Sequence, residues 1–100
     1  MTDLVRTGEG RIAVSPAALS RLVVRAAEQV DGARVRRPRR GLRIDVAGGH
    51  ARVSLELSAR RGVALPGLVR AVQERVAEAL GTMLEVKVDA VDVSIEEVRS

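Results

Sequence analysis

One amphipathic stretch, residues 66–83, limits the folds open to this chain more than any other feature. Pro66 suits the first turn of a helix, where its missing N–H would lack a partner in any case. The apolar residues that follow recur at helical spacing and form one stripe: Leu68, Val69, Val72, Val76, Ala79, Leu80 and Met83. Gly81 can adopt the left-handed conformation that ends a helix, so we expect the helix to stop there. Such a helix must pack on another apolar surface, which the neighbouring segments have to supply.

A second helix is predicted earlier in the chain. Ser15 followed by Pro16 is typical of an N-cap and the first helical residue. Apolar residues then continue at helical spacing: Leu19, Leu22, Val23, Ala26 and Val30. Gly32 is expected to end this helix. Residues 10–14 are a short strand candidate, whereas residues 1–9 show no period and are expected to form a flexible terminus.

The middle of the chain predicts a β-hairpin. Apolar and polar residues alternate over residues 42–46 and again over residues 52–58, as they do in half-buried strands. Gly48 and Gly49 between them permit a tight turn with positive φ.

The end of the chain alternates in two phases. Leu84, Val86 and Val88 fall on even positions, whereas the apolar residues of 91–95 fall on odd ones. A single pleated strand cannot keep both sets on one face unless it slips by one residue. We favour a β-bulge near residues 89–90, because no glycine or proline marks a turn there. The alternative is a turn between two short strands.

The predicted order is therefore strand, helix, two hairpin strands, helix, strand. Because each helix has one apolar side, both should cover one face of the sheet. We expect an α+β fold of the split βαβ type, β-α-β-β-α-β, with a mostly antiparallel sheet and a single domain over residues 10–98. The residues expected on the uncovered face are Arg43, Asp45, Arg52, Ser54, Glu56, Lys87, Asp92 and Ser94.

Composition narrows the chemistry. The 100 residues include no cysteine and no aromatic residue, which excludes disulfides, thiolate metal sites and an aromatic core. The net charge is +4, but without the five arginines of residues 33–41 the remaining 12 basic residues face 13 acidic ones. The longest uncharged stretch, residues 12–20, is shorter than the roughly 20 apolar residues of a membrane span. We expect a cytoplasmic protein.

No catalytic or metal site is predicted. His50 is the only histidine, and Ser54 on the same expected strand lies about 13 Å along it, beyond hydrogen-bond reach. One imidazole among carboxylates is too few nitrogen or sulfur ligands for a typical transition-metal site. No glycine-rich phosphate loop is present. The sequence therefore suggests neither a cofactor nor a small-molecule substrate.

A basic loop over residues 33–41 is the strongest charged feature. Its arginines are Arg34, Arg36, Arg37, Arg39 and Arg40. They could bind phosphates of nucleic acid or of lipid head groups, or they could simply keep a solvated loop soluble. Reading of single-stranded bases is not expected, because the chain has no aromatic side chain to stack on them.

A strand edge is the second candidate surface. The segment with Val91, Val93 and Ile95 is β-prone and low in charge. If it lies at the edge of the sheet, it can pair with a second copy of the chain. If neighbouring elements cover it, it is ordinary core.

Three motifs in order resemble the alkaline shock protein family of bacterial stress and cell-envelope proteins. The first comprises Gly10, Ile12, Val14, Ser15 and Pro16, then Ala26, Ala27, Glu28, Val30, Asp31 and Gly32. The second comprises Gly62, Val63, Leu65, Pro66, Val72, Gln73, Glu74 and Val76. The third comprises Val91, Asp92, Val93, Ser94, Ile95, Glu96 and Val98. Arg61, where the family often has an aromatic residue, and the short segment 33–41 depart from the family pattern.

The resemblance implies a small α+β domain without known catalytic residues. It also implies a scaffold that self-associates, with some members held at the inner face of the membrane by a small membrane-anchored partner. We therefore expect a non-enzymatic, self-associating stress-response protein. The alternative is a module that binds nucleic acid or an anionic membrane surface through the five arginines.

Overall fold

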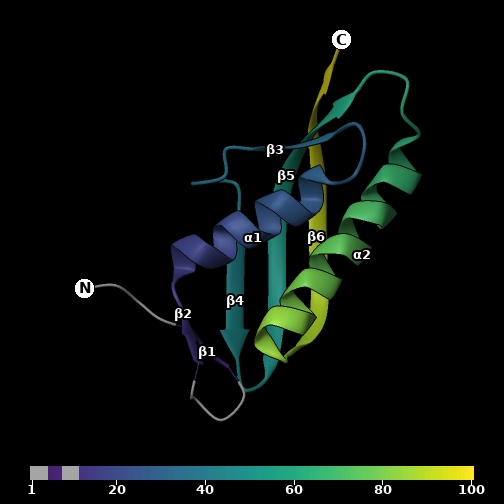
Figure 1. The fold of residues 1–100 in the computed structure, drawn as a ribbon. Helices are drawn as coiled ribbons and strands as arrows, with labels where there is room; N and C mark the ends of the chain where they lie inside the picture. Colours follow the sequence, from purple (N-terminus) through teal and green to yellow (C-terminus); the bar gives the residue numbers. More distant parts are fainter. Residues whose placement is uncertain (1–4, 8–11) are drawn as a thin grey trace.

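The structure, a computed structural model, describes residues 5–7 and 12–100 (Figure 1). Its elements in chain order are β1 Val5–Thr7, β2 Ile12–Val14, α1 Pro16–Glu28, β3 Ala33–Arg36, β4 Arg43–Ala47, β5 His50–Arg60, α2 Leu65–Leu84 and β6 Lys87–Arg99. The predicted helices, hairpin and closing strand are all present.

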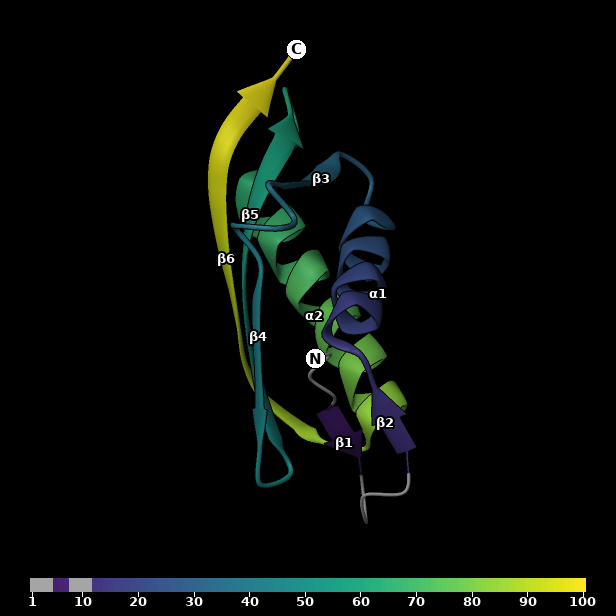
Figure 2. The ribbon, with the colours of Figure 1, turned by 90° about the vertical axis from the view of Figure 1, so that its left-hand side faces the viewer.

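The main sheet is built around β5. Strands β3 and β4 pair antiparallel with successive halves of β5 along one edge, and β6 pairs parallel with β5 along the other. Both helices lie on one face of this sheet, as the side view in Figure 2 shows. The α+β class, with two helices on one face of a mostly antiparallel sheet, is confirmed.

Two strands differ from the expectation. β2, which we expected in the main sheet, pairs instead with β1 in a separate two-stranded sheet. β1 itself falls in the stretch 1–9 that we expected to form a flexible terminus; residues 1–4 and 8–9 of that stretch lie outside the described residues. The main sheet takes its additional strand from β3, within the segment expected to be a loop.

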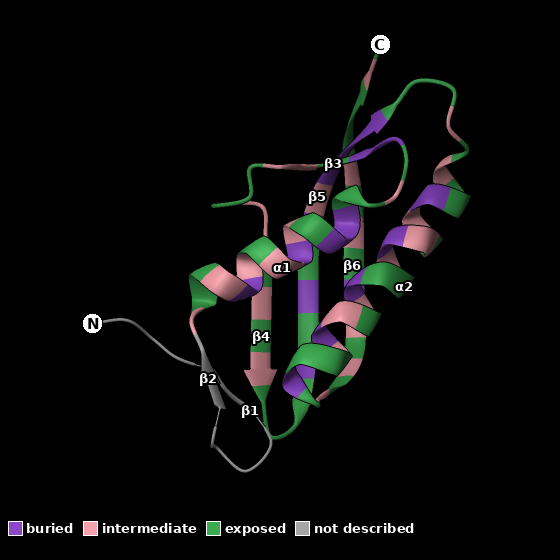
Figure 3. Ribbon diagram, in the orientation of Figure 1, coloured by how far each residue is buried: buried purple, intermediate pink, exposed green. Residues whose placement is uncertain are grey.

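An aliphatic layer fills the space between helices and sheet. The buried residues of α2 are Leu68, Val72, Val76, Leu80 and Leu84, and those of β5 on the same side are Ala51, Val53, Leu55, Leu57 and Ala59. Figure 3 shows these buried positions recurring along both helices and along β5. Met83, expected in the α2 stripe, is instead 48% exposed. The predicted core therefore forms, with Leu84 in place of Met83 as the buried residue of the last turn.

The ends of the helices follow their capping residues. At α1 the hydroxyl oxygen of Ser15 accepts the N–H of Ala18 (N–Oγ 3.2 Å), which confirms the predicted N-cap. At α2 the expected stop at Gly81 is wrong. The helix continues to Leu84 and ends at Glu85, which takes the left-handed conformation (φ 54°) and donates to the oxygen of Gly81 (N–O 3.0 Å). Because Leu84 is fully buried, the extra turn gains more from burial than the left-handed residue costs.

The predicted β-bulge is confirmed. Ala51 pairs with Val88 and Arg52 pairs with Ala90, so the register of β6 skips one residue at Asp89. This slip returns the apolar side chains of β6 to the helix side of the sheet. A second slip at Glu96, which the sequence pattern did not show us, lies near the end of the strand.

The other face of the sheet is uncovered by the described residues (Figure 2). Seven of the residues expected there are exposed and Glu56 is half-buried. Ser58, on the same face, is buried because the guanidinium of Arg99 donates to its hydroxyl (Nη1–Oγ 3.0 Å) and to its main-chain oxygen (2.8 Å). This face is therefore polar and charged, with Arg99 covering its β3 end.

Asp31 and Arg60 form a two-pronged ion pair that joins the loop after α1 to the end of β5. Two guanidinium nitrogens of Arg60 lie 2.9 and 2.8 Å from the two carboxylate oxygens of Asp31. Hydrogen bonding and attraction from Arg60 hold the pKa of Asp31 below its usual value of 3.8. A lowered pKa in the folded state stabilises the fold above the pKa of the unfolded chain, and this contribution is lost as pH falls through the folded value.

The variant Asp31→Asn tests this ion pair. We expect the parent to melt at a higher temperature than the variant at neutral pH. The gap should close as the pH falls below the usual aspartate range, because the carboxylate is then protonated in both states. Thermal melts followed by circular dichroism across that pH range measure the gap. A gap that widens toward acid pH would contradict the pairing.

Candidate interaction surfaces

Hydrogen bonding within the sheet decides which main-chain groups of β5 point toward β6. The N–H of Arg60 donates to the oxygen of Gly32 (N–O 2.8 Å), on the β3 side of β5. Main-chain groups of successive strand residues point to opposite sides. The main-chain N–H and C=O groups of even-numbered β5 residues therefore point toward β3 and β4. Those of odd-numbered residues, such as Leu55, point toward β6.

This arrangement leaves alternate residues of β6 at an open edge. Leu55 is paired with Val93, and in a parallel pair its main-chain groups bond to the residues on either side of that partner, Asp92 and Ser94. Within the described chain, β6 pairs with no strand other than β5. The residues whose main-chain groups face the open edge are Val91, Val93 and Ile95.

The side chains of these three residues do not form an exposed apolar patch. Val91 is buried, and Val93 and Ile95 are half-buried on the helix side of the sheet. The amide of Gln73 on α2 donates to the main-chain oxygen of Val91 (Nε2–O 3.0 Å), so this oxygen already has a partner. What the edge offers is main-chain hydrogen bonding, chiefly at Val93 and Ile95.

The expected basic loop is partly a strand. Ala33 and Val35 pair with Ala59 and Leu57, and face the helices. The expectation of a loop over 33–41 is therefore wrong for Ala33–Arg36. The arginines dominated our interpretation, although the alternation of Ala33 and Val35 with two charged residues was the available signal.

The five arginines consequently divide into two groups. Arg34 and Arg36 lie on β3 and face the uncovered side of the sheet, opposite Ser58 and Glu56. The other three, Arg37, Arg39 and Arg40, lie in a turn that closes back on itself through main-chain bonds. Arg37 has positive φ (46°), and its oxygen accepts the N–H groups of Arg40 (2.8 Å) and Gly41 (2.6 Å). Phosphate binding by these arginines stays a prediction.

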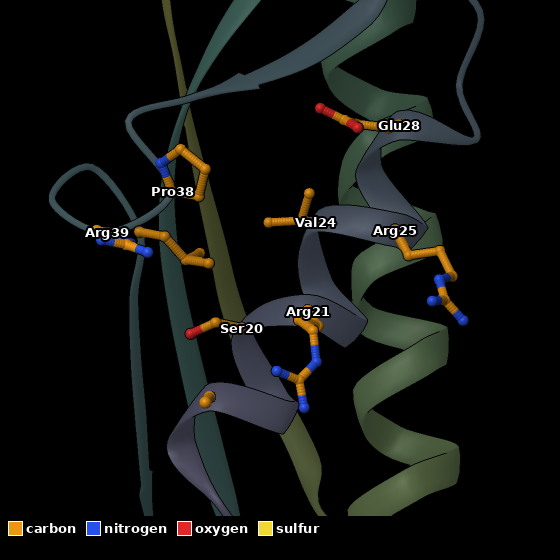
Figure 4. Close-up of a pocket in the computed structure, with 9 residues that line it drawn as sticks. Ser20, Arg21, Val24, Arg25, Glu28, Pro38 and Arg39 are labelled. Atoms are coloured by element: carbon orange, nitrogen blue, oxygen red, sulfur yellow. The ribbon is translucent and has the colours of Figure 1, made fainter.

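A groove that we name the basic groove separates this turn from α1. Its volume is about 740 Å³. The residues that line it are Ala17, Ser20, Arg21, Val24, Arg25, Glu28, Pro38, Arg39 and Leu42. In Figure 4, Arg21 and Arg25 project from α1, whereas Pro38 and Arg39 lie across from that helix. The carboxylate of Glu28 accepts the N–H of Val35 (Oε2–N 3.0 Å), so the one acidic side chain is engaged within the chain.

A second groove, which we name the acidic groove, runs between α2 and β6. Its volume is about 460 Å³. The residues that line it are Gln73, Glu74, Ala77, Val88, Asp89, Ala90, Val91 and Asp92. It has no basic side chain in its lining. We did not predict either groove, because each forms between segments that are far apart in the sequence or on different elements.

His50 has a structural partner. Its ring Nδ1 lies 3.1 and 3.0 Å from the two carboxylate oxygens of Asp89, the residue skipped at the bulge. The pair joins the first residue of β5 to the third residue of β6. Beside it, the N–H of Lys87 donates to the main-chain oxygen of Gly49 (N–O 2.9 Å). Among the described residues, no hydrogen bond links His50 to Ser54, and no three acidic, histidine or cysteine side chains group as metal ligands. The imidazole therefore fastens two strands.

The structure also bears on membrane insertion. In the described part of the chain, neither helix combines the length and apolar character that crossing a bilayer requires.

Comparison with known proteins gives a family and a fold. A search among curated proteins found no match. Among solved structures, a cadmium form of MamM CTD is 24% identical, with a TM-score of 0.55 over 84% of this chain and 96% of that one. A nickel form of MamM CTD is 22% identical, with a TM-score of 0.55 over 84% of this chain and 99% of that one. Likeness at this identity shows the fold alone.

The family model provides the assignment. The model of the alkaline shock protein 23 family, described as having a cell envelope-related function, matches residues 5–100. This range contains all three motifs that carry the resemblance in the sequence. The chain therefore belongs to the alkaline shock protein family, whose function is related to the cell envelope.

Proposed function

We propose that this protein is a non-enzymatic scaffold of the cell-envelope stress response that works by self-association through the edge of β6. The observation that carries the proposal is the open edge itself. β6 is 13 residues long, pairs with β5 alone within the described chain, and turns the main-chain groups of Val93 and Ile95 outward. An edge of this length is a template for another strand.

The surroundings of His50 support a scaffold over an enzyme. Its ring is held by Asp89 at the bulge. The shallow groove that the pair lines, of about 470 Å³, has no serine, threonine or cysteine in its lining. The family description supports action at the cell envelope. We place the scaffold at the inner face of the membrane, held there by a small membrane-anchored partner.

Proline substitutions at neighbouring positions of β6 test the edge. Val93→Pro removes an N–H that faces outward, whereas Ser94→Pro removes one that bonds to β5. We expect Val93→Pro to weaken self-association by about tenfold or more while the sheet remains folded. Ser94→Pro, the matched comparison, should lower the melting temperature more than Val93→Pro does, because it removes a bond of the sheet.

Sedimentation equilibrium from micromolar to millimolar concentration measures the association. The parent should show masses that rise above the 10.7 kDa of one chain as the concentration rises. A parent that stays at the mass of one chain throughout would overturn the proposal. So would a folded Val93→Pro variant that associates as strongly as the parent.

A further inference from the structure

The fold separates charge between its two sides. Residues 15–47, which form α1, β3 and β4, contain eight arginines and three acidic residues. Residues 65–100, which form α2 and β6, contain seven acidic residues and four basic ones. Since β5 lies between β4 and β6, the two groups occupy opposite edges of the sheet, as Figure 1 shows. The domain is therefore positive along one edge and negative along the other.

Each edge carries one of the two grooves. The basic groove presents Arg21 and Arg39 around an apolar floor that includes Val24 and Leu42, whereas Arg25 at its margin points away from the turn (Figure 4). The acidic groove places Glu74 beside the smaller apolar surface of Ala77, Val88 and Val91. Of the other two carboxylates in its lining, Asp89 is paired with His50, and Asp92 lies at the β6 edge on the uncovered face of the sheet. The two grooves are opposite in charge, and each combines charged groups with an apolar floor.

Within the described residues β4 pairs only with β5, so the main chain is open at this edge as well. The even-numbered residues of β5 bond to β4, and Arg52 is paired with Asp45. The neighbours of Asp45, which are Ile44 and Val46, therefore turn their main-chain groups outward. They are the counterparts of Val93 and Ile95 on β6. Helix faces helix and strand faces strand when the β4 edge of one copy meets the β6 edge of another.

Charge decides between this arrangement and a twofold dimer. Two β6 edges paired about a twofold axis near Ser94 and Ile95 would set Asp92 of each copy opposite the acidic residues at the end of the other copy's strand, Glu96 and Glu97. Like charges set opposite one another across strands destabilise the pairing. Opposite edges instead bring arginines to carboxylates, which favours encounter and fixes the register.

We propose that copies of this chain associate head to tail, with the basic groove and β4 edge of one copy against the acidic groove and β6 edge of the next. This inference rests on the proposed self-association and adds the second surface and the geometry. A contact between two different surfaces leaves one of each free on every pair. The assembly is therefore a row, or a ring where the rotation between successive copies closes, whose sheet continues from copy to copy.

Charge reversal on one edge at a time tests the arrangement. The basic-edge variant carries Arg39→Glu and Arg40→Glu, and the acidic-edge variant carries Glu74→Lys and Asp92→Lys. All four side chains are exposed, so the fold should survive. Each variant alone should associate at least about tenfold more weakly than the parent. Mixed in equal amounts, they should associate again, because each retains the native edge that the other lacks.

A control and a second measurement sharpen the result. Arg52→Glu with Arg61→Glu reverses the same number of exposed charges on β5 and the turn after it, away from both edges, and should leave association unchanged. The parent has no cysteine, so single-cysteine variants can report which edges meet. Mixtures of Arg40→Cys and Asp92→Cys should cross-link to each other with a short bis-maleimide, and Asp92→Cys alone should not.

The outcomes separate this inference from the proposed function. If the parent never associates, both the proposed self-association and the head-to-tail geometry are wrong. A parent that associates while both charge-reversed variants match it, or cross-links between two Asp92→Cys copies, keeps self-association and overturns the head-to-tail geometry. Duplex RNA and anionic vesicles are tested in parallel. If the basic-edge variant loses binding to either of them and still associates with itself, the basic groove serves that ligand and the inference is wrong.

Discussion

Replacing Leu80 with alanine is expected to lower the free energy of unfolding by about 2–5 kcal/mol. Leu80 is fully buried and packs in the aliphatic cluster between α2 and β5. The change removes buried methyl groups and leaves a cavity. The chain has no Phe, Tyr or Trp whose side chain could shift to fill that space. For a domain of this size, stability is of the order of 5–15 kcal/mol in total, so the loss is a large share of it. Chemical denaturation monitored by circular dichroism measures the change.

Met83→Ala is the matched control on the same helix. Met83 lies three residues further along α2 and is 48% exposed. Its truncation should change the free energy of unfolding by no more than about 0.5 kcal/mol. Equal losses for the two variants would mean that the last turns of α2 do not bury the face described here.

Replacing Gly32 with alanine should destabilise the fold by about 2–5 kcal/mol, combining backbone strain with overpacking. Gly32 is buried with φ +91°, a conformation that side chains disfavour. An added Cβ would lie 2.9 Å from Cγ2 of Val63 and 3.5 Å from Cδ1 of Leu68. The backbone cannot easily withdraw, because the oxygen of Gly32 accepts the N–H of Arg60 (2.8 Å) and a guanidinium N–H of Arg99 (3.3 Å).

Gly62 provides a control with the same backbone angle. Its φ is +90°, but no atom lies within 4 Å of the position that a Cβ would take. Gly62→Ala should therefore show only the backbone term, about 1–2 kcal/mol. The difference between the two variants in denaturant unfolding isolates the overlap with Val63. If Gly32→Ala is no worse than Gly62→Ala, the close packing around Gly32 is wrong.

Predictions from the sequence were most accurate where a residue's role depends on its near neighbours. Ser15 caps α1 because its hydroxyl reaches an N–H three residues away. The bulge at Asp89 was predictable because two apolar sets of opposite parity in one strand require a slip. The uncovered face of the hairpin followed from the same alternation.

Predictions were least accurate where distant contacts outweigh local preference. Gly81 can end a helix, yet α2 continues because Leu84 reaches the core. β3 forms among arginines because Ala33 and Val35 pair with the far half of β5, more than twenty residues away. In both cases the local signal, a glycine that can end a helix or a run of arginines typical of a loop, is stronger than any local signal for the structure that forms.

The features of the candidate surfaces also fall into those with a local signal and those that depend on distant contacts. Hydrophobic period and capping act over a few residues, so the helix stripes, the hairpin, the slipped closing strand and the three family motifs could be predicted before the fold was known. The edge position of β6, the basic groove between α1 and a turn, and the acidic groove between α2 and β6 could not. These features depend on which elements become neighbours across β5. That arrangement is set cooperatively, because all of the elements bury their apolar residues in the same aliphatic layer.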